Sequence, residues 1–155
     1  MRTIDELLAE APTFAGMTAE QLELIAGCAV NEVFAPGAFL LRENQPANRF
    51  YVIRRGTVAL ETFVPHRGAL TLETIEAGDV LGWSWLVPPY RTEFDARALE
   101  ETHAIAFDAA CLRGKAEDDP ALGYELMRRF VPVMVGRLQA TRLRLLDVYG
   151  HVAAG

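Results

Sequence analysis

The chain has 155 residues and a formal net charge of −6, from 15 basic and 21 acidic side chains with neutral histidines. Hydrophobic residues make up 51% and charged residues 23%, a balance that excludes intrinsic disorder and allows a sizeable core. This length predicts a single domain over residues 1–155. The acidic charge disfavours nucleic acid as a partner, because phosphate binding relies on clustered Lys and Arg.

No apolar stretch approaches the roughly 18 residues that would suggest a membrane span. Asp5 and Glu6 interrupt the N-terminal region where a secretory signal would be apolar. We therefore expect a cytoplasmic protein with no membrane partner. Cys28 and Cys111 form no Cys-x-x-Cys pair and are too few for a four-thiolate site, so we expect two reduced thiols and no metal.

Residues 1–30 have a helical pattern. Thr18 is followed three residues later by Gln21, a capping-box pattern that predicts the start of a helix. Leu22 and Ile25 give this helix an apolar face, and Gly27 lies near its expected end.

Residues 31–108 have the pattern of a β-roll, in which short runs of β-branched and aromatic residues alternate with glycine-containing turns. The expected strands are 32–35, 38–41, 50–53, 57–63, 70–75, 94–99 and 103–107. Strands at this spacing predict a sandwich or barrel of antiparallel strands rather than a βαβ sheet.

Residues 109–150 are again helical, and the last helical pattern runs from about Pro120 to Tyr149. Pro132 is expected to start or kink the last helix, since an interior proline removes a backbone hydrogen bond. Apolar residues repeat along one helix face, with Arg142 as a charged interruption: Val131, Val135, Leu138 and Leu145, followed by Tyr149. This seam predicts a homodimer, with Val131, Val135, Leu138 and Leu145 as its interface residues.

The order of these segments and their glycine turns resemble one known family. The turns are Pro36-Gly37, Arg55-Gly56 and Ala77-Gly78-Asp79, and Gly82 follows the last of them. Together they resemble the cyclic nucleotide-binding domains of catabolite-activator proteins and protein-kinase regulatory subunits. The resemblance implies a mainly β fold: an antiparallel, jelly-roll-like barrel of about eight strands, with N-terminal helices and a long C-terminal helix. Tight corners at Gly37, Gly56 and Gly78 would require a positive φ, which glycine adopts at little cost.

A cupin-type jelly roll is the alternative fold. Its metal would require a His-x-His pair with further ligands. His66, His103 and His151 are scattered along the chain, which disfavours this alternative.

In the family that the chain resembles, the ligand lies in a cassette between two late strands. The resemblance implies that N–H groups at a short helix start bind the cyclic phosphate, that a glutamate after a glycine binds the ribose, and that an arginine pairs with the phosphate. This sequence departs from that pattern, because Trp83 stands where the glutamate belongs. Thr92 occupies the arginine position, with Arg91 one residue early, and Phe94 replaces a small residue.

The cassette provides the candidate ligand-binding residues, which are Gly82, Trp83, Ser84, Trp85, Tyr90, Arg91, Thr92 and Phe94. Three interpretations stay open. In the first, the pocket binds a different ligand, nucleotide-like or flat and aromatic, that stacks on Trp83 or Trp85. The aromatic residues instead fill the pocket and leave a ligand-free docking domain. In the third, cyclic nucleotide binds weakly through Arg91. Nearby, Asp95 and Arg97 share a strand face, which predicts a structural ion pair.

The resemblance implies a regulatory sensor module. The sequence also contains no nucleophile–base pair, metal-ligand spacing or phosphate loop, so we expect no enzyme. Catabolite activators place a helix-turn-helix after the long helix, whereas this sequence ends at Gly155. We therefore expect no DNA-binding domain and no direct DNA binding. Signalling is expected through a homodimer or a separate effector protein.

Overall fold

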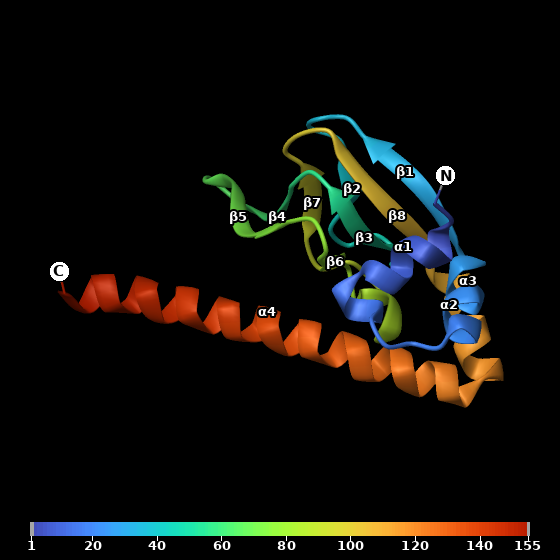
Figure 1. Cartoon of the computed structure of the whole chain (residues 1–155). Coiled ribbons are helices and arrows are strands. Elements are labelled where there is room, and N and C mark those ends of the chain that lie inside the picture. Colours follow the sequence, from blue (N-terminus) through green and yellow to red (C-terminus); the bar gives the residue numbers. More distant parts are fainter. Residues whose placement is uncertain (1, 155) are drawn as a thin grey trace.

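A computed structural model describes residues 2–154 of the chain, with the side chains of residues 2–150. Helices lie at both ends of this part of the chain, and eight strands lie between them (Figure 1). The N-terminal elements are α1 (Ile4–Glu10), the 3₁₀ turn η1 (Pro12–Phe14) and α2 (Ala19–Ala26). The central elements are β1 (Ala29–Phe34), β2 (Phe39–Leu41), β3 (Arg49–Arg55), β4 (Val58–Val64), β5 (Gly68–Ile75), β6 (Val80–Leu81), the 3₁₀ turn η2 (Ser84–Leu86), β7 (Asp95–Ala98) and β8 (Thr102–Asp108). The C-terminal helices are α3 (Ala109–Asp118) and α4 (Pro120–Ala154).

The strands form two four-stranded sheets, in the orders β1-β8-β3-β6 and β2-β7-β4-β5. Neighbouring strands in both sheets are antiparallel. Buried side chains from both sheets form one core, which includes Tyr51, Ile53, Leu60, Ile75 and Leu81. The expected fold class, a mainly β, jelly-roll-like barrel flanked by helices, is confirmed.

The capping box at the start of α2 is confirmed. The Gln21 N–H donates to the Thr18 hydroxyl at 3.1 Å, and the Thr18 N–H donates to the Gln21 side chain at 3.2 Å. Strand β1 begins at Ala29, slightly earlier than the sequence pattern indicated. The cause is tertiary, because Ala29 pairs with Phe107 of β8.

The glycine turns have the predicted backbone conformation. Gly37, Gly56 and Gly78 have φ angles of 87°, 100° and 94°. At Gly56 a Cβ would lie 2.7 Å from the carbonyl oxygen of Glu101, so a larger residue there would displace the neighbouring chain as well as strain the turn.

A second core joins the helices to the β-roll through stacked aromatic rings. The ring of Phe50, on β3, lies between those of Phe107 and Trp85, with centroid distances of 4.4 and 4.5 Å and nearly parallel planes. Phe130 of α4 meets Phe50 and Trp85 edge-on, at 5.2 and 5.4 Å. Such stacked and edge-to-face pairs add about 0.5–1.5 kcal/mol each beyond the burial of their area. The stack therefore fixes α4 against the sheet.

Helix α4 begins well before Pro132 and continues through it. It has 35 residues, starts at Pro120 and contains Pro132 in its interior, so Pro132 does not start the last helix, and a kink there stays a prediction. Leu122, Leu126 and Phe130 are buried and hold the first turns to the body of the domain. Pro132 lies on the exposed side, where water can bind the carbonyl group that lacks its helical partner. Within residues 2–154 no helix is long and apolar enough to cross a membrane.

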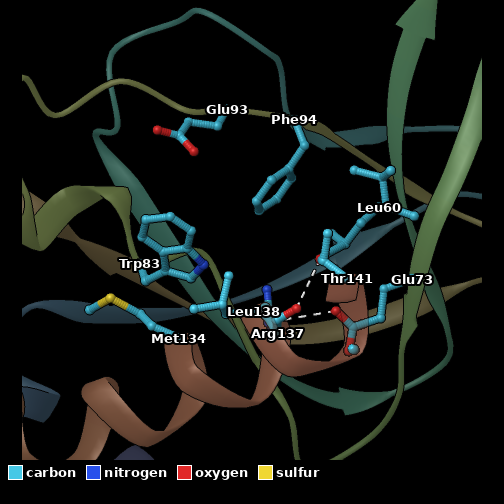
Figure 2. Close-up of a pocket in the computed structure, with 11 residues that line it drawn as sticks. Leu60, Glu73, Trp83, Glu93, Phe94, Met134, Arg137, Leu138 and Thr141 are labelled. Atoms are coloured by element: carbon cyan, nitrogen blue, oxygen red, sulfur yellow. Dashed lines mark hydrogen bonds and ion pairs between the residues drawn. The ribbon is translucent and has the colours of Figure 1, made fainter. Parts of the chain in front are cut away.

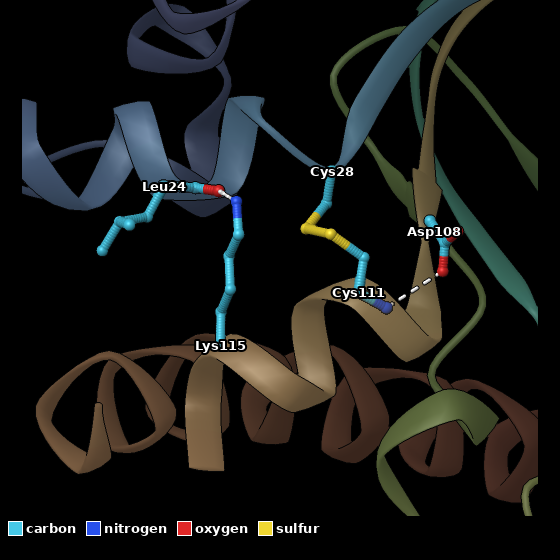
Figure 3. The surroundings of a disulfide bond; sticks show 5 residues. All are labelled: Leu24, Cys28, Asp108, Cys111 and Lys115. Carbon is cyan, nitrogen blue, oxygen red and sulfur yellow. Dashed lines mark hydrogen bonds between the residues drawn. A yellow bond between two sulfur atoms is a disulfide. The ribbon is translucent and has the colours of Figure 1, made fainter. Parts of the chain in front are cut away.

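The two cysteines form a disulfide, so the expectation of two reduced thiols was wrong (Figure 3). Cys28 immediately precedes β1 and Cys111 lies in the first turn of α3, with 5.7 Å between their Cα atoms. The pairing of β1 with β8 brings them together, and the Asp108 N–H donates to the Cys28 carbonyl group at 2.8 Å. Lys115 strengthens the same junction by donating to the Leu24 carbonyl group at 2.7 Å. Sequence spacing alone did not indicate this pairing, because 83 positions separate the two residues.

The expected ion pair between Asp95 and Arg97 was also wrong. Arg97 donates two hydrogen bonds to Glu61, at 2.8 and 3.0 Å, across the β4–β7 pairing. The register places Ala59 opposite Arg97 and Glu61 opposite Asp95, so Glu61 and Arg97 are diagonal neighbours. Asp95 instead accepts from the Glu43 N–H at 2.7 Å and pairs with Arg42 at 3.5 Å.

Breaking the disulfide should lower the free energy of unfolding by about 2–4 kcal/mol, because the cross-link restricts a long loop of the unfolded chain. Urea unfolding without reductant would compare the wild type with the double variant Cys28→Ser/Cys111→Ser. Dithiothreitol should bring the wild type to the stability of the variant and leave the variant unchanged. Two free thiols per chain, titrated in denatured and unreduced protein, would contradict the pairing.

Glu61 should make stability depend on pH. The hydrogen bonds from Arg97 hold the pKa of the Glu61 carboxyl below its usual range, so this contribution is present above the unfolded-state pKa and is lost as the pH falls through the folded-state pKa. Glu61→Gln should cost about 1 kcal/mol near pH 7 and less near pH 3, measured by urea unfolding. Glu100→Gln, an exposed glutamate, is the control. Equal losses for Glu61→Gln at both pH values would show that the carboxylate charge has no such role.

Candidate functional site

The cassette begins at Gly82, directly after β6. Gly82 has a φ of 94°, and a Cβ there would lie 3.4 Å from atoms of Leu41 and Phe50. Trp83 follows at the N-cap of η2, and Trp85 lies within η2. These two tryptophans have different environments, because Trp83 is partly buried whereas Trp85 is 1% exposed in the aromatic stack.

A cavity of about 400 Å³ lies between the cassette, the second sheet and α4 (Figure 2). The sheet contributes Leu60 of β4 with Leu72 and Glu73 of β5. Trp83, Glu93 and Phe94 line it from the cassette, and Met134, Arg137 and Leu138 line it from α4. Most of these side chains are apolar, and the charged groups are two carboxylates and one guanidinium. The cavity therefore suits a ligand with an apolar body and few polar groups.

Arg137 is the cationic group of this cavity. Its side chain is 13% exposed, and its Nη2 donates to the Val80 carbonyl group. Its Nε lies 3.9 Å from the Glu73 carboxylate, while its Nη1 is buried without a hydrogen-bond partner. Burial lowers the pKa of the Arg137 guanidinium, and the carboxylates of Glu73 and Asp79 oppose this effect. An arginine still stays protonated at neutral pH.

Of the candidate ligand-binding residues, Trp83 and Phe94 line the cavity. Trp85 does not line it, because its ring stacks against Phe50 in the core, so it cannot stack on a ligand there. Ser84 is buried beside it, and its carbonyl group accepts from the Val87 N–H at 3.2 Å.

The candidates Tyr90, Arg91 and Thr92 lie away from the cavity. Their backbone pairs with the loop before β3: the Thr92 N–H donates to the Gln45 carbonyl group at 2.9 Å, and the Tyr90 carbonyl group accepts from Ala47 at 2.7 Å. The Arg91 guanidinium donates to the carbonyl group of Asn44 at 2.7 Å and does not line the cavity. The Tyr90 ring lies 4.5 Å from the Arg113 guanidinium of α3, which also donates to the Trp85 carbonyl group.

Sequence reasoning missed Arg137 and Glu73 as site residues. A weak signal for Arg137 was present, since Arg137 and Arg144 are seven residues apart on one side of the helix, away from the apolar seam. Both reach the β-roll, and Arg144 donates to the Thr71 carbonyl group at 3.1 Å. Nothing in the pattern of β5 distinguished Glu73 from the other exposed polar residues of that strand.

Comparisons with known proteins agree with this architecture. The cyclic nucleotide-binding domain model matches residues 31–119, more than half of the chain. A CRP-like cAMP-activated global transcriptional regulator of Mycobacterium tuberculosis is 26% identical over 145 residues. The match covers 94% of this chain and 63% of the regulator, so the chain spans less than two thirds of that protein's length.

Solved structures have the same fold. A candidate cyclic nucleotide-binding protein from Geobacter metallireducens superposes with a TM-score of 0.77 at 28% identity, covering 89% of this chain and 99% of that one. A cyclic nucleotide-binding domain from Methylobacillus flagellatus gives a TM-score of 0.78 at 19% identity, covering 94% of this chain and 82% of that one. The resemblance seen in the glycine turns is thus confirmed: the chain belongs to the cyclic nucleotide-binding domain family.

Proposed function

We propose that the chain is a non-enzymatic sensor domain that binds a small ligand in the cavity beneath α4, and that this cavity is not a standard cAMP site. The observation that carries the proposal is the open cavity of about 400 Å³ bordered by cassette and helix. A domain whose aromatic residues had filled the pocket would not retain such a space. This favours a ligand-binding function over a ligand-free docking domain.

The groups around the cavity differ from those that a cyclic nucleotide requires. Trp83 occupies the position of the family's ribose-binding glutamate, and Phe94 replaces a small residue near the phosphate position. Arg91, the nearest candidate for the phosphate-binding arginine, is held at the Asn44 carbonyl group outside the cavity. The Glu73 and Glu93 carboxylates line the space, which further disfavours a phosphate group.

Both cAMP and cGMP should bind with dissociation constants above about 100 µM. A lost hydrogen bond to a charged group costs about 1.5–3 kcal/mol, and two such losses reduce affinity by about two to four decades. Isothermal titration calorimetry measures the dissociation constant of each nucleotide. Submicromolar binding of either would overturn the proposal, and its loss in Arg91→Ala would establish instead the interpretation in which Arg91 binds the phosphate.

We further propose that two copies of the chain associate along α4. The described residues from 131 to 150 are exposed or only partly buried, and many of them are apolar. The seam that the sequence indicated is exposed along its length, with Val131 45%, Val135 46%, Leu138 61%, Leu145 55% and Tyr149 63% exposed. Tyr124, which is 65% exposed and lies seven residues before Val131, extends the same pattern toward the start of the helix. A second copy of the same helix matches this pattern, because a two-fold axis pairs each seam with itself.

Leu145→Glu should convert the dimer to a monomer, because a charge would be buried within a desolvated seam. Leu145 is chosen over Leu138, which also lines the cavity. Leu143→Glu is the control: this leucine is 68% exposed but lies off the seam. Sedimentation equilibrium at micromolar concentration would measure the oligomeric state of the wild type and of both variants. A monomeric wild type, or equal effects of the two variants, would exclude this interface.

The remaining expectations stay predictions. We propose that the chain acts on a separate effector protein and does not itself contact DNA, given its net charge of −6. A cytoplasmic location also stays a prediction. The disulfide weighs against it, because reducing compartments keep most thiols free.

A further inference from the structure

Two buried hydrogen-bond donors of the cavity lack acceptors. They are the indole Nε1 of Trp83 and the Nη1 of Arg137, and both residues line the same space (Figure 2). A buried donor without a partner is unfavourable, since it has left water without gaining a protein bond. Side chains that line a pocket and retain free donors fit a ligand that supplies the acceptor.

The charges around these donors limit the class of ligand. Arg137 is the one cation among the lining residues, and Glu73 and Glu93 are both acids. Glu73 lies 3.9 Å from the Arg137 Nε and neutralises part of its field. A doubly charged phosphate monoester would be repelled by two carboxylates and attracted by only one guanidinium. A carboxylate carries one charge, and its two oxygens match the guanidinium fork.

We infer that the ligand of this cavity is a small carboxylate with an apolar, preferably flat, body, and that Arg137 of α4 binds its carboxylate. This inference rests on the proposed sensor function and assigns the anion-binding role to the helix instead of the cassette. The body of the ligand lies against Trp83, Phe94 and Leu72. Trp83 adds its indole N–H as a second donor.

The ligand has to displace a side chain to reach these donors, because both nitrogens are closed to solvent in the free chain. Leu138 is suited to this movement, because it follows Arg137 on α4, lines the cavity and is 61% exposed, so its displacement leaves no buried void. The carboxylate also competes with Glu73 for the guanidinium. Removing the Glu73 charge should therefore favour the ligand.

Three probes with the same ring system test the inference: 1-naphthoate, its neutral amide 1-naphthamide, and 1-naphthyl phosphate. Calorimetric titration of the full chain should give tighter binding of naphthoate than of the amide, by about tenfold or more, and weaker binding of the phosphate than of naphthoate. Arg137→Met should reduce naphthoate affinity much more than amide affinity, because only the carboxylate carries a charge that pairs with the guanidinium. Arg144→Met, on the same side of α4 but outside the cavity, should have no effect.

Glu73→Gln provides a test that does not depend on removing Arg137. It should tighten naphthoate binding several-fold and change amide binding little, with folding checked by circular dichroism. Equal affinities for naphthoate and amide, or tightest binding of the phosphate, would overturn the carboxylate inference and leave the sensor proposal standing. Failure of all three probes to bind at millimolar concentration would overturn both.

Discussion

The stacking of Phe50 between Trp85 and Phe107 is the interaction on which the rest of the structure depends. These rings come from β3, from the cassette and from β8, and Phe130 of α4 closes the cluster edge-on. One cluster thus fixes the first sheet, the cassette and the long helix relative to one another. Because close-packed interiors tolerate few vacancies, a change in any of these rings would move the others. The cavity beneath α4 keeps its shape for this reason.

The same stack explains why two neighbouring tryptophans have different roles. Trp85 extends the aromatic core, while Trp83, two residues earlier and just after the turn at Gly82, borders the cavity. The positive φ of Gly82 allows the chain to turn there, close to Phe50. Arg113 of α3 donates to the Trp85 carbonyl group and lies over the Tyr90 ring, so the cassette is also attached to α3. Tyr90 and Arg91 do not line the cavity.

Local chemistry was readable in the sequence, and long-range pairing was not. The capping box at Thr18 and the turns at Gly37 and Gly56 depend on a few adjacent residues, so their patterns predicted them correctly. The Cys28–Cys111 bond and the Glu61–Arg97 pair depend on strand register, which the sequence alone did not specify. Of the candidate ligand-binding residues in the cassette, Trp83 and Phe94 line the cavity, and their role in binding stays a prediction. The cassette pattern could not locate Arg137, because that residue reaches the cavity only through the way in which Phe130 seats α4.

The position of Arg137 gives the cavity a direct connection to the rest of the helix. Along α4, Phe130 anchors the helix to the core, Arg137 lines the cavity and donates to the Val80 carbonyl group, and the exposed seam continues past Leu145. Leu138 belongs both to the cavity lining and to the seam. A ligand that binds Arg137 therefore acts on the same rigid element that presents the seam, with no intermediate segment. Such a ligand can shift the helix only as far as it binds one position of α4 more tightly than another. In the complex that we propose, competition between the ligand and Glu73 for one guanidinium would be a source of that difference.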